Sequence, residues 1–159
     1  TKYLSFSFWK TAGGKWKPKP HIKAYQKLIR KLKQLTKRSW SISLDNRIQR
    51  INYLVRGWIN YFRIANMKNK IAEIDEHLRV RIRVIIWKQW KKIGKRQKSL
   101  EQLGVDTELA HNIACTRKGY YQICKTQYIQ FAINNERLRK RGLVFLLDQY
   151  TKVHIECTN

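Results

Sequence analysis

The stretch Val80–Lys92, VRIRVIIWKQWKK, says most about the fold of this chain and about its partner. It contains no acid and combines branched apolar residues, two tryptophans and repeated arginine and lysine. Cations beside large aromatics are typical of a surface that binds a polynucleotide. At a helical repeat its isoleucines continue one apolar stripe, while Val80, Val84 and Trp87 lie on the opposite side. The helix is therefore either packed between two other elements or turns one face to a ligand.

The whole chain shares this charge balance. It has 35 Lys and Arg against 10 Asp and Glu, a formal net charge of +25 on 159 residues. A hydrophobic content of 43% is enough for a core, so the chain is no disordered basic tail. Such a charge implies an extended polyanion as partner. No apolar run is long enough to span a membrane and no signal peptide is visible, so we expect no membrane partner.

Three amphipathic helices are predicted in the first two thirds of the chain. Residues 21–38 repeat apolar side chains at intervals of three and four, with lysine and arginine on the other faces. A second helix is expected to start at the N-cap Ser43, with Asp45 in its first turn and Trp58 on its core stripe. The third helix covers residues 70–92. We leave open whether Arg56 and Arg63, on one flank of the second helix, contact phosphate or form surface ion pairs.

The two ends of the chain carry different patterns. Alternation in residues 3–9 and a turn at Thr11–Gly14 predict a β-hairpin over residues 3–19. Pro18 and Pro20 are expected to stop the ladder and to mark either an edge or a linker. A lone hairpin is marginal in water, so we expect it to belong to a larger sheet. Residues 93–98 are interpreted as a basic linker, and shorter helices follow.

Three expectations concern local structure in this last part. Gly104 and Gly142 are expected to follow helix ends, and Asp106 to cap a helix start. Residues 143–150 are helix or strand. The fold class is therefore mainly α: a β-hairpin, a three-helix bundle and a smaller C-terminal helical region.

The sequence offers little catalytic chemistry. Glu73, Asp75 and Glu76 form the one cluster of acids, and a solvated face explains them better than a metal site. His111 and Cys115 are one helical turn apart and could share a metal, but an ordinary helix face is the preferred interpretation. We predict no catalytic residue, no metal ligand and no cofactor in this chain. The odd number of cysteines and the lack of a CxxC pair favour a reducing compartment. We therefore expect a cytoplasmic location, of the bacterial type or inside an organelle.

The order of several short motifs resembles the C-terminal part of group II intron reverse transcriptase/maturases. These motifs are YLSFSF, a GG turn, KPKP, a basic helix, SISLDNRI, RGWINYFRIA, WKQWKK and RKGYY. The resemblance implies that residues 1–20 end the reverse transcriptase palm and that residues 21–92 form the thumb, also called domain X or maturase domain. It further implies that residues 99–159, after the linker at 93–98, form a DNA-binding-like region. This chain has Ser5 where the family usually has glycine.

The resemblance also implies partners and contacts. Such proteins bind their intron RNA, promote its splicing, and grip template–primer or target DNA during homing as RNA-directed DNA polymerases. Magnesium is expected only in the palm, which with the fingers would be a further partner of these helices. The alternative function is a stand-alone basic ribonucleoprotein or ribosome-associated protein. The candidate RNA- or DNA-binding residues are Lys15, Lys17, Arg56, Asn60, Tyr61, Arg63, Arg79, Arg81, Arg83, Trp87, Lys88, Lys91, Lys92, Arg117, Lys118 and Tyr120.

Overall fold

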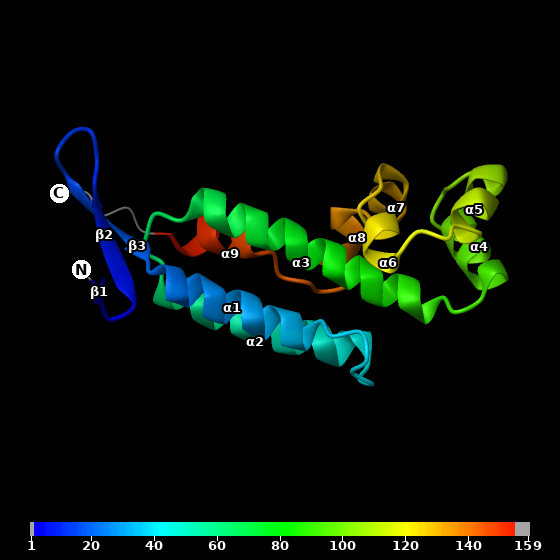
Figure 1. The fold of residues 1–159 in the computed structure, drawn as a ribbon, viewed down its shortest axis with the longest axis horizontal. Coiled ribbons are helices and arrows are strands. Elements are labelled where there is room, and N and C mark those ends of the chain that lie inside the picture. The colour runs from blue at the N-terminus through cyan, green and yellow to red at the C-terminus, as the bar shows by residue number, and fades with distance from the viewer. Residues whose placement is uncertain (1, 155–159) are drawn as a thin grey trace.

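The computed structural model describes residues 2–154 and shows an elongated, mainly helical molecule with a small sheet at one end (Figure 1). This confirms the predicted fold class. The strands are β1 Lys2–Tyr3, β2 Phe6–Lys10 and β3 Trp16–Pro20. The helices are α1 Ile22–Leu35, α2 Leu44–Tyr61, α3 Lys68–Gln89, α4 Ile93–Gln102, α5 Thr107–Ala114, α6 Tyr120–Cys124, α7 Gln127–Ala132, α8 Asn135–Lys140 and α9 Leu146–Val153.

The sheet is antiparallel with the order β1-β2-β3, so β3 is an edge strand. The prolines do not stop the ladder, because β3 pairs with β2 as far as Pro20. They do mark an edge, one of the two predicted alternatives, and an edge strand tolerates residues without an N–H. Leu4 and Ser5 link β1 to β2 with φ of 46° and 68°. Glycine is the residue that adopts this left-handed region without steric cost, so Leu4 and Ser5 hold a backbone conformation that other residues seldom adopt.

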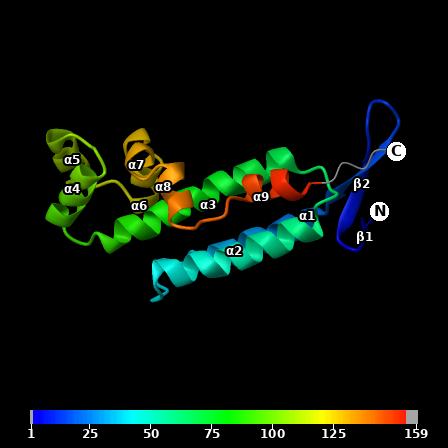
Figure 2. The same ribbon diagram turned by 180° about the vertical axis from the view of Figure 1, so that it is seen from behind.

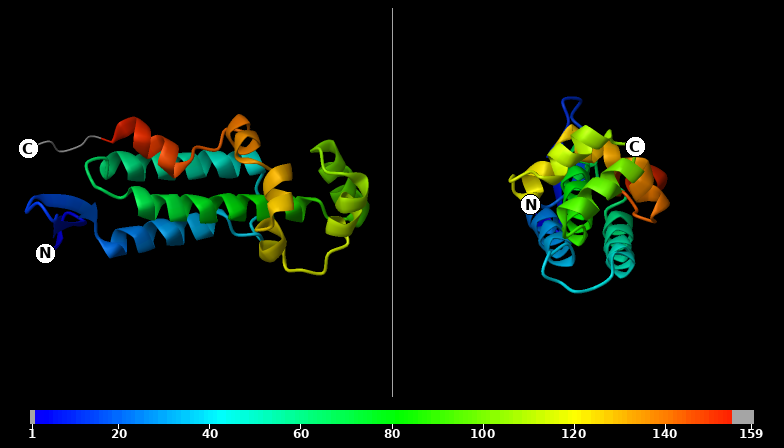
Figure 3. Two further views of the ribbon diagram at one scale, coloured as in Figure 1. Left: turned by 90° about the horizontal axis from the view of Figure 1, so that it is seen from above. Right: turned by 90° about the vertical axis from the view of Figure 1, so that its right-hand side faces the viewer.

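Helices α1, α2 and α3 form the predicted three-helix bundle. Seen end-on, they occupy the corners of a triangle, and the loop between α1 and α2 lies on the side away from α3 (Figure 3). The hydroxyl of Ser43 accepts a hydrogen bond from the N–H of Asn46 at 3.2 Å, as the predicted N-cap of α2 requires. Trp58 is only partly buried, although it lies on the core stripe of α2.

Helix α3 is buried on two sides. Its isoleucine stripe faces the α1–α2 pair, and Val80, Val84 and Trp87 on the other side are buried as well. Helix α6 packs against this part of α3, and Arg96 of α4 lies over Trp87, whereas α9 packs against α3 nearer to its start, at Asp75. Of the two possibilities left open by the sequence, packing between other elements is therefore the one that the structure shows.

The C-terminal part returns to the bundle. Helix α9 packs against both α2 and α3, and Figure 2 shows it lying along α3. The sequence left residues 143–150 undecided between helix and strand, and in the structure residues 146–150 form the first part of α9. Helix α4 packs chiefly against α5, at the end of the molecule opposite the sheet.

Two further points concern the ends of these helices. Residues 93–98, predicted to be a linker, instead form the first half of α4. Gly104 and Gly142 both have a φ of 92°, which confirms them as left-handed residues after helix ends. Within residues 2–154, no helix combines the length and apolar character needed to cross a bilayer.

Candidate nucleic-acid interface

Four cations and one aromatic ring lie where the end of α1, the second half of α3 and the starts of α4 and α6 come together. We call Arg38, Arg81, Lys88, Arg96 and Tyr120 the Tyr120 cluster. The guanidinium carbons of Arg38 and Arg96 lie 5.3 Å and 5.7 Å from the centre of the Tyr120 ring. Such distances are typical of cation–π contacts, which hold the two positive groups close together on one side chain.

Hydrogen bonds to backbone carbonyls and to one hydroxyl fix three cations of this cluster. The ammonium of Lys88 donates to the carbonyl of Arg38 at 2.9 Å, and Arg96 Nε donates to the carbonyl of Trp90 at 2.9 Å. Arg81 Nε donates to the hydroxyl of Thr36 at 2.5 Å. These bonds use only part of each donor group, because a guanidinium offers five N–H groups and an ammonium three.

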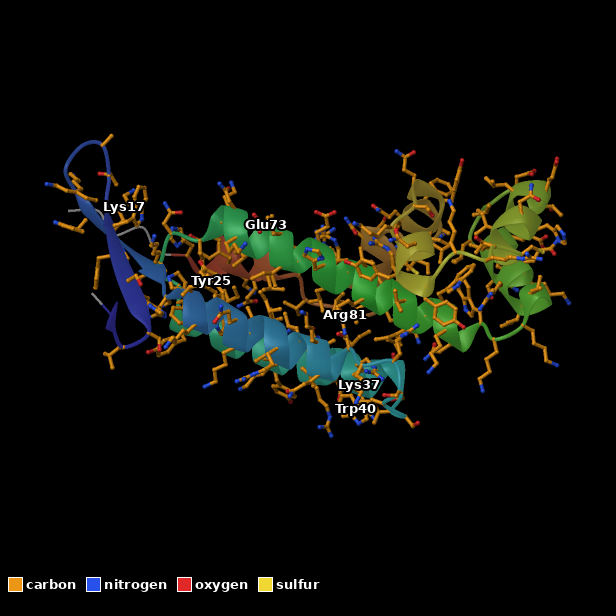
Figure 4. All side chains as sticks on the ribbon, viewed as in Figure 1. Lys17, Tyr25, Lys37, Trp40, Glu73 and Arg81 are labelled. Atoms are coloured by element: carbon orange, nitrogen blue, oxygen red, sulfur yellow. The ribbon has the colours of Figure 1, made fainter. Side chains whose placement is uncertain are left out.

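A cavity of about 480 Å³ adjoins the Tyr120 cluster. Arg38, Arg81 and Tyr120 line it together with Lys37 and Gly119. Burial lowers the pKa of Arg81, and the positive charge of Arg38 acts in the same direction. Figure 4 shows Arg81 on α3, with Lys37 beyond it at the end of α1. Like charges held together in a cavity favour an anion as occupant.

No acid balances these charges. The ion pairs found among residues 2–154 involve Lys70, Arg79, Arg139, Lys140 and Arg141, and none includes a cation of the Tyr120 cluster. Acids paired with cations would compete with phosphate for the same donors. Unpaired cations at fixed positions are instead ready to replace the counterions of a polynucleotide.

The structure brings several predicted site residues to this place. Arg81, Lys88 and Tyr120 belong to the cluster itself, and the exposed Arg117 and Lys118 directly precede Gly119 of the cavity wall. Lys91 and Lys92 are exposed between α3 and α4. These seven positions therefore share one end of the bundle.

A second group of predicted residues lies toward the sheet. Lys15 and Lys17 are exposed on the hairpin, and Figure 4 shows Lys17 at the end of the molecule away from Arg81. Arg56 and Arg63 are exposed and take part in none of the ion pairs that the described residues form, so the structure gives no support to the ion-pair alternative.

Asn60 and Tyr61 lie in the same region and have partners within the chain. The Asn60 side-chain oxygen accepts from Gln149 at 3.4 Å, and the Tyr61 hydroxyl donates to the Leu4 carbonyl at 2.9 Å. Tyr61 therefore helps to hold the sheet against α2. Both side chains remain exposed.

Three predicted contacts are corrected by their burial or pairing. Trp87 is 0% exposed, since α6 and α4 arrive on the face that the sequence left open. Arg83 is buried and donates to the Ile133 carbonyl at 2.8 Å, so it anchors the α7–α8 junction. Arg79 pairs with the buried Asp75 at 2.9 Å. Trp87 and Arg83 are therefore not part of the surface, and Arg79 is partly exposed with its charge paired to Asp75.

Sequence reasoning missed Arg38 as a candidate. It lies in the loop after α1 and belongs to no periodic stripe or motif, and only the packing of α6 against α3 brings Tyr120 to it. Arg96 carried a weak signal, as one of a run of cations with few acids nearby.

His111 and Cys115, the pair considered for metal binding, lie within contact distance of each other. Cys115 Sγ lies 3.6 Å from Nε2 of His111, and His111 Nδ1 lies 3.1 Å from the side-chain oxygen of Gln97. In the part of the chain that the structure describes, no three His, Cys, Asp or Glu side chains are grouped so as to hold a metal ion.

A helical bundle with a fixed cation cluster, free of acids among the described residues, has the charge that a polyanion-binding module requires. A family model described as "Group II intron, maturase-specific domain" matches residues 25–104, about half of the chain, from α1 to the end of α4. The chain therefore belongs to the group II intron maturases, which act in the splicing of these introns. A comparison with curated proteins gave no match.

Proposed function

We propose that this chain binds folded group II intron RNA through the Tyr120 cluster and the cations around it, and so promotes splicing. The observation that carries the proposal is a set of four cations, Arg38, Arg81, Lys88 and Arg96, that form no ion pair among the described residues. Arg38 and Arg96 lie over the Tyr120 ring, and Arg81 and Lys88 are bonded beside them. All four cations lie within residues 25–104, the maturase-specific segment, although Tyr120 lies outside it. The family therefore indicates group II intron RNA as the polyanion.

The cluster suits a folded RNA because its cations are already positioned. Arg81 and Lys88 are tied to the end of α1, and Arg96 to the end of α3, so little side-chain freedom is lost when phosphates replace water. Arginine presents a planar fork that matches phosphate oxygens, and several fixed forks can recognise the spacing of phosphates in one RNA fold. Stabilising that fold requires no catalytic group in the protein.

The proposal includes the wider role that the motifs imply. The exposed cations of the hairpin and of α2 are candidates for contacts with an RNA–DNA heteroduplex or target DNA during homing. In this view the chain is the thumb and maturase part of a reverse transcriptase, works in the cytoplasm or its organellar equivalent, and depends on a palm elsewhere in the protein for Mg²⁺ and polymerisation.

Binding across a salt series tests the proposal. The double variant Arg38→Gln with Lys88→Gln removes two exposed cations of the cluster, and Lys68→Gln with Lys152→Gln removes two exposed cations elsewhere. If both cluster cations contact phosphate, the slope of log K against log salt for folded intron RNA decreases by about 1.4 to 1.8 in the cluster variant. The control pair should leave the slope unchanged.

An unrelated folded RNA of equal length completes the experiment. A preference of the wild-type chain for the intron that persists at high salt supports recognition of shape. A cluster variant with the same slope and affinity as the control pair overturns the assignment of the site. Equal affinities for both RNAs at all salt concentrations overturn the assignment of the intron as the specific ligand.

A further inference from the structure

We propose that a groove between α1, α2 and the sheet binds an unpaired polynucleotide strand, with a base stacked on Tyr53. This inference rests on the proposed function, because it adds a second contact site for the same class of ligand. Of the residues that line it, Tyr61 was predicted as a contact from the sequence, whereas Tyr53 and the lysines of α1 were not. We call it the α1–α2 groove.

The α1–α2 groove has a volume of about 610 Å³ and two chemically different walls. Helix α1 contributes Lys23, Lys27 and Lys31, while α2 contributes Tyr53, Trp58 and Tyr61. Gly57 of α2 also lines the groove, and no atom lies within 4 Å of the position that a Cβ would take there. None of the lining residues belongs to α3 or to the Tyr120 cluster, so this is a separate site.

The three lysines form a row of unbalanced charge. They recur every four residues, so their Cα atoms are about 6 Å apart along the helix axis. All three are exposed, and none takes part in the ion pairs of the described chain. Helix α1 contains no acid, and Asp45, the one acid of α2, pairs with Arg141 at 3.3 Å. The row is therefore suited to follow a chain of phosphates.

The aromatic wall is rigid except at one position. Trp58 packs against Phe62 with ring centres 4.6 Å apart, and the hydroxyl of Tyr61 donates to the sheet. Tyr53, in contrast, is 78% exposed and makes no hydrogen bond or ring contact with the described residues. A large aromatic side chain left in solvent beside a charged row is available for a flat apolar partner.

The combination favours an unpaired strand over other anionic partners. Aromatic side chains bind bases by their faces, and a duplex hides these faces in its own stack. An acidic peptide would satisfy the lysines but would leave Tyr53 without a planar partner. An unpaired strand satisfies both walls at once, with phosphates along α1 and bases toward α2.

Fluorescence anisotropy with two short RNA probes tests this inference on the full chain. The probes are an oligouridylate, which has little structure of its own, and a GC-rich duplex of the same length. Tyr53→Ala should weaken binding of the oligouridylate about fivefold or more, the lower limit for losing one base–aromatic stack. Tyr53→Phe keeps the ring and should bind like the wild type. Tyr128→Ala removes another exposed tyrosine, on α7, and should also have no effect.

A charge pair completes the design. Lys27→Gln with Lys31→Gln should decrease the salt slope for the oligouridylate, and Lys68→Gln with Lys152→Gln should not. The groove assignment is overturned if Tyr53→Ala matches Tyr128→Ala, if Tyr53→Phe binds as weakly as Tyr53→Ala, or if Tyr53→Ala affects the duplex equally. Thermal melting of each variant separates unfolding from lost contact.

The two proposals fail in different ways. If the wild-type chain binds folded intron RNA but not the oligouridylate, the groove assignment falls and the Tyr120 cluster stands. If Arg38→Gln with Lys88→Gln leaves intron RNA binding intact while Tyr53→Ala reduces oligouridylate binding, the cluster assignment falls and the groove stands.

Discussion

Arg47 gives the most direct test of how this fold holds its candidate site in place. Its guanidinium donates to the carbonyls of Leu35 at 2.5 Å, Lys37 at 3.2 Å and Trp40 at 2.7 Å. Its guanidinium carbon also lies 5.1 Å from the centre of the Trp40 ring. Arg47 therefore caps the end of α1 and shapes the loop that carries Arg38. We expect Arg47→Met, which keeps most of the volume but no donor, to destabilise both.

The magnitude can be worked from these contacts. Two short bonds from a charged donor contribute about 1.5–3 kcal/mol each, or about 3–6 kcal/mol together. The longer bond to exposed Lys37 is left out because water can replace it. Arg47 Nε is buried without a partner and burial lowers the pKa of Arg47, so removing the charge recovers about 1–2 kcal/mol. The free energy of unfolding should therefore decrease by about 1–5 kcal/mol.

Urea unfolding followed by circular dichroism measures this loss, and Arg50→Met is the matched control. The guanidinium of Arg50 also lies over the Trp40 ring, at 5.4 Å, but Arg50 is exposed and caps no carbonyl. The control should stay within about 0.5 kcal/mol of the wild type. A loss below about 1 kcal/mol in Arg47→Met would refute the reasoning, because it would mean that water satisfies the end of α1 equally well.

Two further predictions concern buried groups. Trp87→Ala should decrease the free energy of unfolding by about 3–5 kcal/mol in urea titrations, because it empties a buried position. Trp87→Phe, if well folded, should bind intron RNA like the wild type. A loss of RNA affinity in Trp87→Phe would show that Trp87 is a contact after all. Burial raises the pKa of Asp75. At a pH between the ordinary pKa of an aspartate and this raised pKa, the folded chain therefore keeps a proton that the unfolded chain has lost. The free energy of unfolding should therefore fall as the pH rises from about 4 through the folded pKa. Urea midpoints across this range should show the fall, and Asp75→Asn should remove it; an unchanged slope would contradict the burial argument.

Much of the fold could be predicted because it depends on local patterns. The apolar repeats of α1, α2 and α3 and the caps at Ser43 and Asp106 act within one or two helical turns, so the sequence displays them directly. The helix at 93–102 was missed because its first half shows few apolar residues. Ser99 and Leu100, in its second half, are the buried positions, where α4 packs against α5.

The candidate site was harder to predict because it depends on contacts between distant segments. Cations on α3 look alike in sequence, yet Lys88 is exposed while Arg83 is buried against α7 and α8. The difference depends on which face the later helices cover, and α3 has apolar residues on both. Tyr53 gave no signal, because an exposed tyrosine between two buried positions is common on helices.

The return of α9 to the bundle has a consequence for the order in which the chain can fold. The N–H of Leu146 donates to buried Asp75 at 3.0 Å, and the side chain of Asn52 bonds both Gly142, at 2.7 Å, and Val144, at 2.9 Å. These contacts span 71, 90 and 92 residues along the chain. During synthesis α2 and α3 must therefore wait, with apolar faces open, until residues 142–153 emerge from the ribosome. A polyanion that binds the first three helices early would shield their charge during this interval.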